Sequence, residues 1–268
     1  MKRADDGIGF LLRYENVAWY ENGSVRILDR RIYPIRTEYV TCRTYHEVAQ
    51  AIADMVTQSG GPYLAAAMGM ALAAYEGRDL SGDALIRHME DAAYTLSHAR
   101  PTTAAKMERI TSHALSLARD AIDRGCSSDA LVALLQENAL DYINANYERY
   151  SVIARYLADQ IPHNGTIMTQ CFAETIIGTL LRECRQRGSD IKVICAETRP
   201  YFQGARLTAS VVCDMGFDVT VISDNMPAYT IGQKKVDVFT SAADVITMDG
   251  HIVNKVGTFQ IALAASYW

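Results

Sequence analysis

The chain has 268 residues, 49% of them hydrophobic and 21% charged, and its formal net charge is −5. This composition is typical of a soluble globular protein with a sizeable core, and the length suits one large domain or two. The sequence has neither the clustered basic residues of a nucleic-acid-binding protein nor an apolar run of the roughly 18 residues that a membrane span needs. The apolar run near the N-terminus is also too short for a signal peptide. We therefore expect a cytoplasmic protein whose partners include no nucleic acid and no membrane.

The six cysteines lie far apart, and no two of them form a Cys-x-x-Cys pair. Such spacing indicates neither a zinc site nor a disulfide framework. We therefore expect no bound metal and anticipate that most of the cysteines are small buried apolar residues.

Residues 1–160 are expected to form a helical domain with a small β-hairpin. β-rich runs within residues 10–30 flank Asn22-Gly23, a dipeptide that favours a type I′ hairpin turn, and another extended run covers residues 36–42. Helical periodicity then continues almost to residue 161. The helices are expected over residues 46–57 and 63–75, from Asp83, from the Arg-Pro-Thr segment at 100–102, and from Ser127 or Ser128 onward.

Residues 161–268 show a different pattern, in which short apolar runs alternate with helical segments. This alternation predicts βαβ units and a parallel sheet, and hence a Rossmann-like domain. Only four strands are expected, so the sheet should be short on its C-terminal side. The runs cover residues 166–169, 191–196, 218–223 and 236–240. The fold class is therefore α/β.

Polar or reactive residues follow each of the four expected strands. Cys171 follows the first strand, residues 197–203 the second, Asp224 the third and Asp244 the fourth. In an open parallel sheet, ligands bind outside the carboxyl ends of the strands. We therefore expect these residues to face one crevice together with Lys255. Each of them alone has an ordinary structural reading, as a buried thiol or a solvated charge, and their common placement is what favours a site.

Cys171 and Asp244 are the residues with the most reactive chemistry. Cys171 is expected at the start of a helix, whose positive end stabilises a thiolate and lowers the pKa of the thiol. Asp244 lies in the apolar segment 242–246, and an apolar setting would raise the pKa of its carboxyl.

The segment ETRPYFQGARLTA at residues 197–209 resembles a signature of the methylthioribose-1-phosphate isomerases. This family shares a superfamily with ribose-1,5-bisphosphate isomerase and with the regulatory subunits of the eukaryotic translation-initiation exchange factor. Further blocks resemble those of the family in the same order, so the resemblance covers nearly the whole chain. They read ARPTTA, NGTIMTQC, DNMPAY and NKVGTFQIALAA. The hairpin and AAAMGMALA are similar to the isomerase branch.

The resemblance implies roles for individual residues. Cys171 and Asp244 match the catalytic pair, and the residues that match the ligands of the sugar phosphate are Arg100, Gln203, Asn254 and Lys255. An aldose 1-phosphate cannot open its ring through a free aldehyde, because its anomeric oxygen carries the phosphate. The acid would therefore protonate the ring oxygen, and the cysteine would move hydrogen between C2 and C1, directly or by assisting a hydride shift. The basic side chains would clamp the phosphate. No cofactor is expected.

The loop before the Ala-rich helix departs from the family pattern. The isomerases carry Arg-Gly-Ala-Pro there, whereas residues 59–62 of this chain read Ser-Gly-Gly-Pro, without an arginine. Glycine allows a close approach of backbone to an anion, so phosphate is expected to contact the amides of Ser59, Gly60 and Gly61. The residues that follow Cys171 and Asp244 depart from the family as well.

Three functions remain open from the sequence. The first is an aldose–ketose isomerase that converts a 5-substituted ribose 1-phosphate, by default S-methyl-5-thioribose 1-phosphate of methionine salvage, to the ribulose 1-phosphate. The second is an isomerase of ribose 1,5-bisphosphate or 5-deoxyribose 1-phosphate. The third is a non-catalytic regulatory subunit that senses a sugar phosphate or nucleotide. Retention of Cys171 and Asp244 favours an enzyme, and the changed loop favours the second or third reading. An unpaired sheet edge predicts a homodimer.

Overall fold

The computed structural model describes residues 3–234 and 236–268, and the chain divides into two compact units. One unit is Arg13–Asn146, and the other combines Met1–Leu12 with Tyr147–Trp268. The division falls within the long helix α6 (Ser128–Ala158), whereas the sequence pattern changes near residue 160, just after this helix ends. Within the described ranges, no helix combines the length and the apolar character needed to cross a membrane.

The unit Arg13–Asn146 contains a three-stranded antiparallel sheet. Its strands, in spatial order, are β1 (Ala18–Glu21), β2 (Ser24–Leu28) and β3 (Tyr39–Cys42). Asn22 and Gly23 join the first two strands with φ values of 48° and 75°. Positive φ at both central residues is what a type I′ turn requires, so the predicted hairpin is confirmed.

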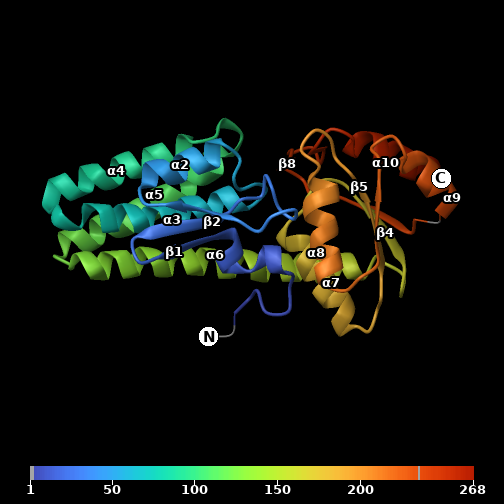
Figure 1. Ribbon diagram of the computed structural model, residues 1–268, viewed down its shortest axis with the longest axis horizontal. Coiled ribbons are helices and arrows are strands. Elements are labelled where there is room, and N and C mark those ends of the chain that lie inside the picture. The colour runs from blue at the N-terminus through green and yellow to red at the C-terminus, as the bar shows by residue number, and fades with distance from the viewer. Residues whose placement is uncertain (1–2, 235) are drawn as a thin grey trace. The chain divides into compact units, whose positions relative to one another are not determined.

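Helix α3 (Gly61–Glu76) is the centre of the same unit and is buried over most of its length. Its alanines and glycine let neighbouring helices approach closely, since a Cβ on Gly69 would lie 2.9 Å from Leu96. The sheet and the surrounding helices pack against it (Figure 1). These helices are α1 (Tyr14–Val17), α2 (Tyr45–Ala53), α4 (Gly82–His98) and α5 (Ala104–Asp123), with the short turn η2 (Gly77–Asp79). The short turn η3 (Pro101–Thr103) contacts α5.

The β-rich run expected before the hairpin turn begins only at Ala18. The preceding residues form the 3-10 turn η1 (Phe10–Leu12) and helix α1. Leu11, Tyr14 and Val17 are all buried and recur every three residues. That spacing is helical and does not alternate as in a half-buried strand, so the extension of the β-rich run to residue 10 was wrong.

The second unit is built on a parallel sheet of four strands, as predicted. They are β4 (Thr166–Thr169), β5 (Lys192–Ala196), β6 (Val219–Ile222) and β7 (Val238–Thr240), in the spatial order β6-β5-β4-β7. From β4 the chain moves to β5 and β6 on one side and then returns to β7 on the other. The order therefore reverses between β4 and β7, and the carboxyl ends of strands at such a point are where ligands bind in open α/β sheets.

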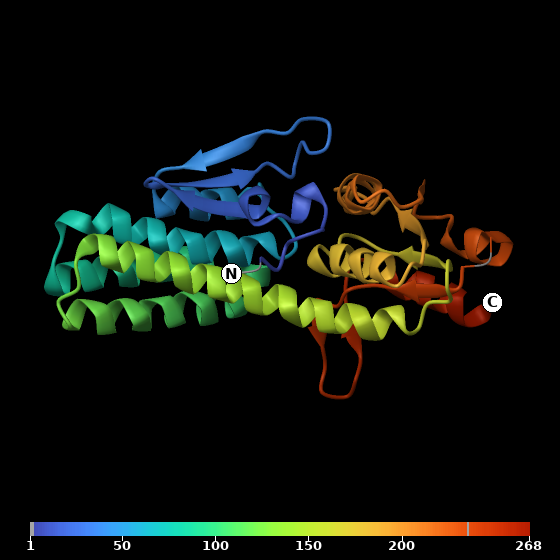
Figure 2. The same cartoon turned by 90° about the horizontal axis from the view of Figure 1, so that it is seen from below.

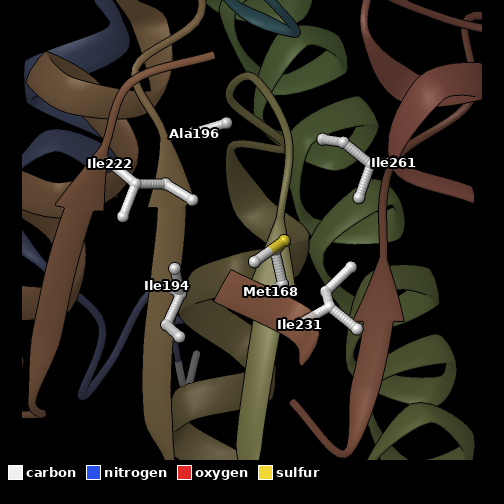
Figure 3. Packing of buried hydrophobic residues seen from close by; sticks show 6 residues of the cluster. All are labelled: Met168, Ile194, Ala196, Ile222, Ile231 and Ile261. Carbon is white, nitrogen blue, oxygen red and sulfur yellow. The ribbon is translucent and has the colours of Figure 1, made fainter. Parts of the chain in front are cut away.

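Helices cover both faces of this sheet (Figure 1). Helices α9 (Pro227–Lys234) and α10 (Thr258–Tyr267) lie on one face, and α7 (Thr175–Gln186) and α8 (Ala209–Asp214) on the other. Figure 3 shows the core on the first face, where side chains of three strands meet one from each helix. These residues are Met168, Ile194, Ala196, Ile222, Ile231 and Ile261.

A second antiparallel hairpin, formed by β8 (Val245–Ile246) and β9 (Ile252–Val253), was not predicted. It stands out from the rest of its unit as the red loop of Figure 2. Helix α10 begins only at Thr258, after Gly257 with a φ of 103°. Asn254 and Lys255 therefore lie in the loop between β9 and α10.

Candidate active site

Cys171 lies at the carboxyl end of β4, beside the point where the strand order reverses. Its backbone has a φ of 61°, and helix α7 begins four residues later. Burial raises the pKa of the Cys171 thiol, while the amide of Phe172 and the charge of Lys255 act in the opposite direction. The expected placement at a helix start, with a lowered pKa, was therefore wrong.

Two buried threonines hold the backbone of Cys171. The Thr198 hydroxyl accepts a hydrogen bond from the Cys171 amide at 3.1 Å and donates to the Ala196 carbonyl at 3.0 Å. The Thr208 hydroxyl donates to the Cys171 carbonyl at 2.6 Å. Thr198 also has a positive φ, of 65°. Left-handed backbone at two non-glycine residues costs free energy that the surrounding contacts must offset, and such strain concentrates at functional sites.

Thr208 reaches Cys171 because of a π-helix, η4 (Gly204–Thr208), that precedes α8. A Cβ on Gly204 would lie 1.8 Å from the Ala196 carbonyl oxygen, so only glycine lets this segment sit against the end of β5. Gln203 of this segment was singled out from the sequence but Thr208 was not, because a π-helix has no distinct sequence period.

Asp224, at the end of β6, binds backbone and has a structural role here. Its two carboxylate oxygens accept hydrogen bonds from the amides of Thr198 and Arg199, at 2.8 and 2.7 Å. Asp224 thereby fixes the turn after β5, and with it the threonine that holds Cys171.

Lys255 is brought close to Cys171 by the loop after β9. Gln170, the residue before Cys171, donates its side-chain amide to the Val256 carbonyl at 2.8 Å. The Lys255 ammonium lies 5.8 Å from the centre of the Tyr201 ring. Its positive charge acts on the Cys171 thiol. Asn254 lies next to it, and its amide nitrogen is 3.4 Å from the Thr258 hydroxyl.

Asp244 also lies near Cys171, since its negative charge helps to raise the pKa of that thiol. Its amide donates to the Val253 carbonyl at 2.8 Å, so Asp244 is fixed at the base of the β8–β9 hairpin. The side chain is exposed, and its neighbours Val245 and Ile246 are 51% and 72% exposed. The expectation of an apolar setting around this carboxyl was therefore wrong.

Two buried amide side chains follow β4 and β5 in the chain, Gln170 directly after β4 and Gln203 just before η4. Gln203 and Gln170 are 5% and 2% exposed, and their side-chain oxygens have no hydrogen-bond partner within the described part of the chain. Buried polar atoms normally have partners. These two atoms are therefore available to a polar ligand, which agrees with the role expected for Gln203 and adds Gln170.

The remaining candidate residues belong to the helical unit. Ser59 is exposed with a φ of 58°, and Gly60 precedes the first turn of α3. The Gly61 amide donates to the Gln58 carbonyl at 3.1 Å. Half-buried Arg100 precedes η3, and its carbonyl accepts from the amide and the hydroxyl of Thr103.

A contact within the helical unit links the starts of α3 and α5. The Lys106 ammonium, in the first turn of α5, lies 4.1 Å from the centre of the Tyr63 ring in the first turn of α3. The turn that carries Arg100 leads directly into α5. The Lys106 ammonium therefore lies beside the first turn of α3.

The chain matches the Initiation factor 2 subunit family over residues 58–267. A methylthioribose-1-phosphate isomerase of Thermosipho africanus is 34% identical over 248 residues, which is 89% of this chain and 70% of the relative. The corresponding protein of Thermotoga maritima is 33% identical over 263 residues, covering 95% of this chain and 74% of the relative. These matches confirm the resemblance found in the sequence.

Two solved structures share the fold. The 5-methylthioribose 1-phosphate isomerase of Pyrococcus horikoshii superposes with a TM-score of 0.81 at 28% identity, covering 94% of this chain and 72% of the other. The translation initiation factor eIF-2B subunit delta from A. fulgidus gives a TM-score of 0.80, also at 28% identity, covering 94% and 74%. The chain therefore belongs to the Initiation factor 2 subunit family and, within it, to the family of the methylthioribose-1-phosphate isomerases.

Proposed function

We propose that this protein is an aldose–ketose isomerase that converts S-methyl-5-thioribose 1-phosphate to the corresponding ribulose 1-phosphate. The observation that carries the proposal is the meeting of Cys171, Asp244 and Lys255 at the carboxyl ends of β4 and β7. A thiol, a carboxyl and an ammonium group are the types that this reaction needs. The names of the curated relatives support the same activity.

In the proposed mechanism, Asp244 donates a proton to the ring oxygen as the bond between that oxygen and C1 breaks. Cys171, once deprotonated, removes the hydrogen from C2 as a proton, and the electron pair forms a double bond between C1 and C2. Protonation of C1 and loss of the proton of the C2 hydroxyl then give the ketose, so the atoms and electrons balance. Because burial raises the pKa of the thiol, the Phe172 amide and the nearby ammonium of Lys255 are what favour the thiolate.

Substrate binding is assigned to the polar groups around these residues. Gln203, Gln170 and Asn254 offer amide groups to the sugar hydroxyls, and Lys255 offers a charge. In the helical unit, the proposal assigns phosphate binding to Arg100 and to the loop of Ser59, Gly60 and Gly61, whose backbone leads into the positive end of α3.

The test of the proposed activity is a steady-state panel of ribose 1-phosphates that carry methylthio, hydroxyl, hydrogen or phosphate at C5. We expect the methylthio sugar to give the highest kcat/KM, about 10⁴ M⁻¹s⁻¹ or above. A higher value for the 1,5-bisphosphate or the 5-deoxy sugar would assign a different pentose phosphate. The absence of turnover for every sugar would contradict the isomerase.

We also propose a homodimer, because apolar side chains gather on the second hairpin and the start of α10. They are exposed at Val245, Ile246, Met248, Ile252, Val253, Val256 and Phe259. Exposed apolar patches of this kind mark interaction surfaces. Light scattering at micromolar concentration should give twice the mass of one chain, and Val256→Glu should lower it to one. We propose a cytoplasmic location as well, since six free cysteines suit a reducing compartment.

A further inference from the structure

The helical unit contains an arginine with no exposed surface, Arg30, which follows β2. Its backbone amide donates to the Val56 carbonyl at 2.8 Å, and its guanidinium donates to the Gln58 carbonyl at 2.6 Å. Both bonds attach Arg30 to the segment that leads into α3. Removing a guanidinium from water is energetically unfavourable, and arginine is rarely buried in full. The complete burial of Arg30 therefore needs a structural or functional explanation.

Arg30 lies directly beside the loop in which the family arginine is missing. The Gln58 carbonyl accepts from Arg30 and also from the amide of Gly61, the first residue of α3. A Cβ on Gly61 would lie 3.1 Å from the Arg30 guanidinium. The charge thus sits against the N-terminal end of a helix of 16 residues, where backbone dipoles already favour an anion.

A second buried group lies at the same point. The Thr57 hydroxyl has no exposed surface and no hydrogen-bond partner within the described ranges of the chain. It is only 1.8 Å from where a Cβ of Gly61 would be, so it faces the start of α3. A hydroxyl that is buried without a partner destabilises the folded protein. Such a group is typical of a site whose ligand supplies the missing hydrogen bond.

We infer that Arg30 and Thr57 form the positively charged part of a binding site for a phosphate monoester at the N-terminus of α3, with Arg30 supplying the charge that the Ser-Gly-Gly loop lacks. The inference rests on the proposed function for the identity of the phosphate, which is that of the sugar 1-phosphate. Arg30 acts through its charge and by holding the Gln58 carbonyl back from the anion. It is thus a positioning residue that favours a dianionic ligand.

The experiment measures the binding of inorganic phosphate to the full chain by calorimetry, together with KM and kcat for the sugar phosphate. We expect Arg30→Gln to weaken phosphate binding and raise KM by at least about tenfold, because the substitution removes a positive charge beside the anion, with a smaller change in kcat. Arg30→Lys should restore part of the affinity, because it restores the charge. Arg31→Gln is the matched control, since Arg31 is half-exposed and pairs with Asp29.

Thr57→Val keeps the inference testable if Arg30→Gln does not fold. Valine has nearly the shape of threonine and removes a buried hydroxyl that has no partner, so the melting temperature should stay the same or rise. Phosphate affinity should nevertheless fall. Unchanged phosphate affinity in the folded Thr57→Val or Arg30→Gln variant, or no phosphate binding by the parent chain, would overturn the inference.

The same measurements separate this inference from the proposed isomerase. If phosphate binds with an affinity that depends on Arg30, but no sugar of the panel is turned over, the phosphate site is supported and the isomerase activity is contradicted. If the methylthio sugar is turned over with the same KM by the parent chain and by Arg30→Gln, the isomerase activity is supported and the phosphate site at Arg30 is contradicted.

Discussion

Asp244→Asn is expected to lower kcat for the sugar phosphate by about 10²–10⁴-fold, the usual contribution of a general acid or base. Asparagine keeps the shape of the side chain and leaves the backbone bond to Val253 in place, but it has no acidic proton to deliver. The ring oxygen would then leave as an unprotonated alkoxide. KM should change less than kcat, because in the proposed mechanism Asp244 acts on the reacting atom and Lys255 binds charge. Steady-state kinetics on the folded variant measure both quantities.

Asp249→Asn provides the matched control, because Asp249 is an exposed acid of the same hairpin. Its hydrogen bonds to Thr247 and His251 hold the pKa of its carboxyl below the ordinary value, and it has no part in the proposed mechanism. It should retain nearly full activity. If Asp244→Asn kept near-normal turnover with an unchanged melting temperature, the acid would have to be sought elsewhere.

The parallel sheet could be predicted because each of its strands is a short β-rich apolar run with polar residues on either side. The pattern of such a run can be recognised without knowledge of the fold. The predicted bounds of β4, residues 166–169, are therefore the observed ones. The hairpin of β8 and β9 was missed because its strands are two residues long and exposed on both faces. With no buried face, they have no alternation of apolar and polar residues to reveal them.

The chemical types at the site could be predicted, but their environments could not. Asp244 has apolar neighbours in sequence, yet they are on an exposed hairpin and do not bury its carboxyl. Cys171 stands before a helix in sequence, but the left-handed turn at 171–174 delays that helix. Burial and distance depend on contacts between segments far apart in the chain, and no local pattern encodes them.

Arg30 is a buried residue of a candidate site that the sequence alone did not reveal. In sequence it is one of two adjacent arginines after a strand, and nothing distinguishes it from Arg31. The fold buries the first under the 57–61 loop and leaves the second half-exposed beside Asp29. The difference arises because only Arg30 faces the segment before α3, a pairing between residues about 28 positions apart.

Cys171→Ser is expected to reduce kcat/KM by about 10²-fold or more, because a hydroxyl is a far weaker acid than a thiol and cannot serve as the anion near neutral pH. Cys213→Ser is the control, since Cys213 is exposed on α8, and it should keep full activity. Comparable losses in both variants would point to a general effect on folding and would remove Cys171 from the mechanism.

The dependence of kcat/KM on pH should reflect the ionisation of the Cys171 thiol. Burial raises the pKa of Cys171, and the proposed base is the thiolate. The active fraction therefore grows about tenfold per pH unit below that pKa, and kcat/KM should still be rising above the ordinary thiol pKa of about 8.5. Labelling with iodoacetamide at neutral pH should modify exposed Cys213 before Cys171, and Cys171 should react only as the pH rises. A kcat/KM that is flat from about pH 6 to 9, with Cys171 labelled first, would mean that the thiol is already ionised in the folded protein. Lys255 and the Phe172 amide would then outweigh the burial of the thiol.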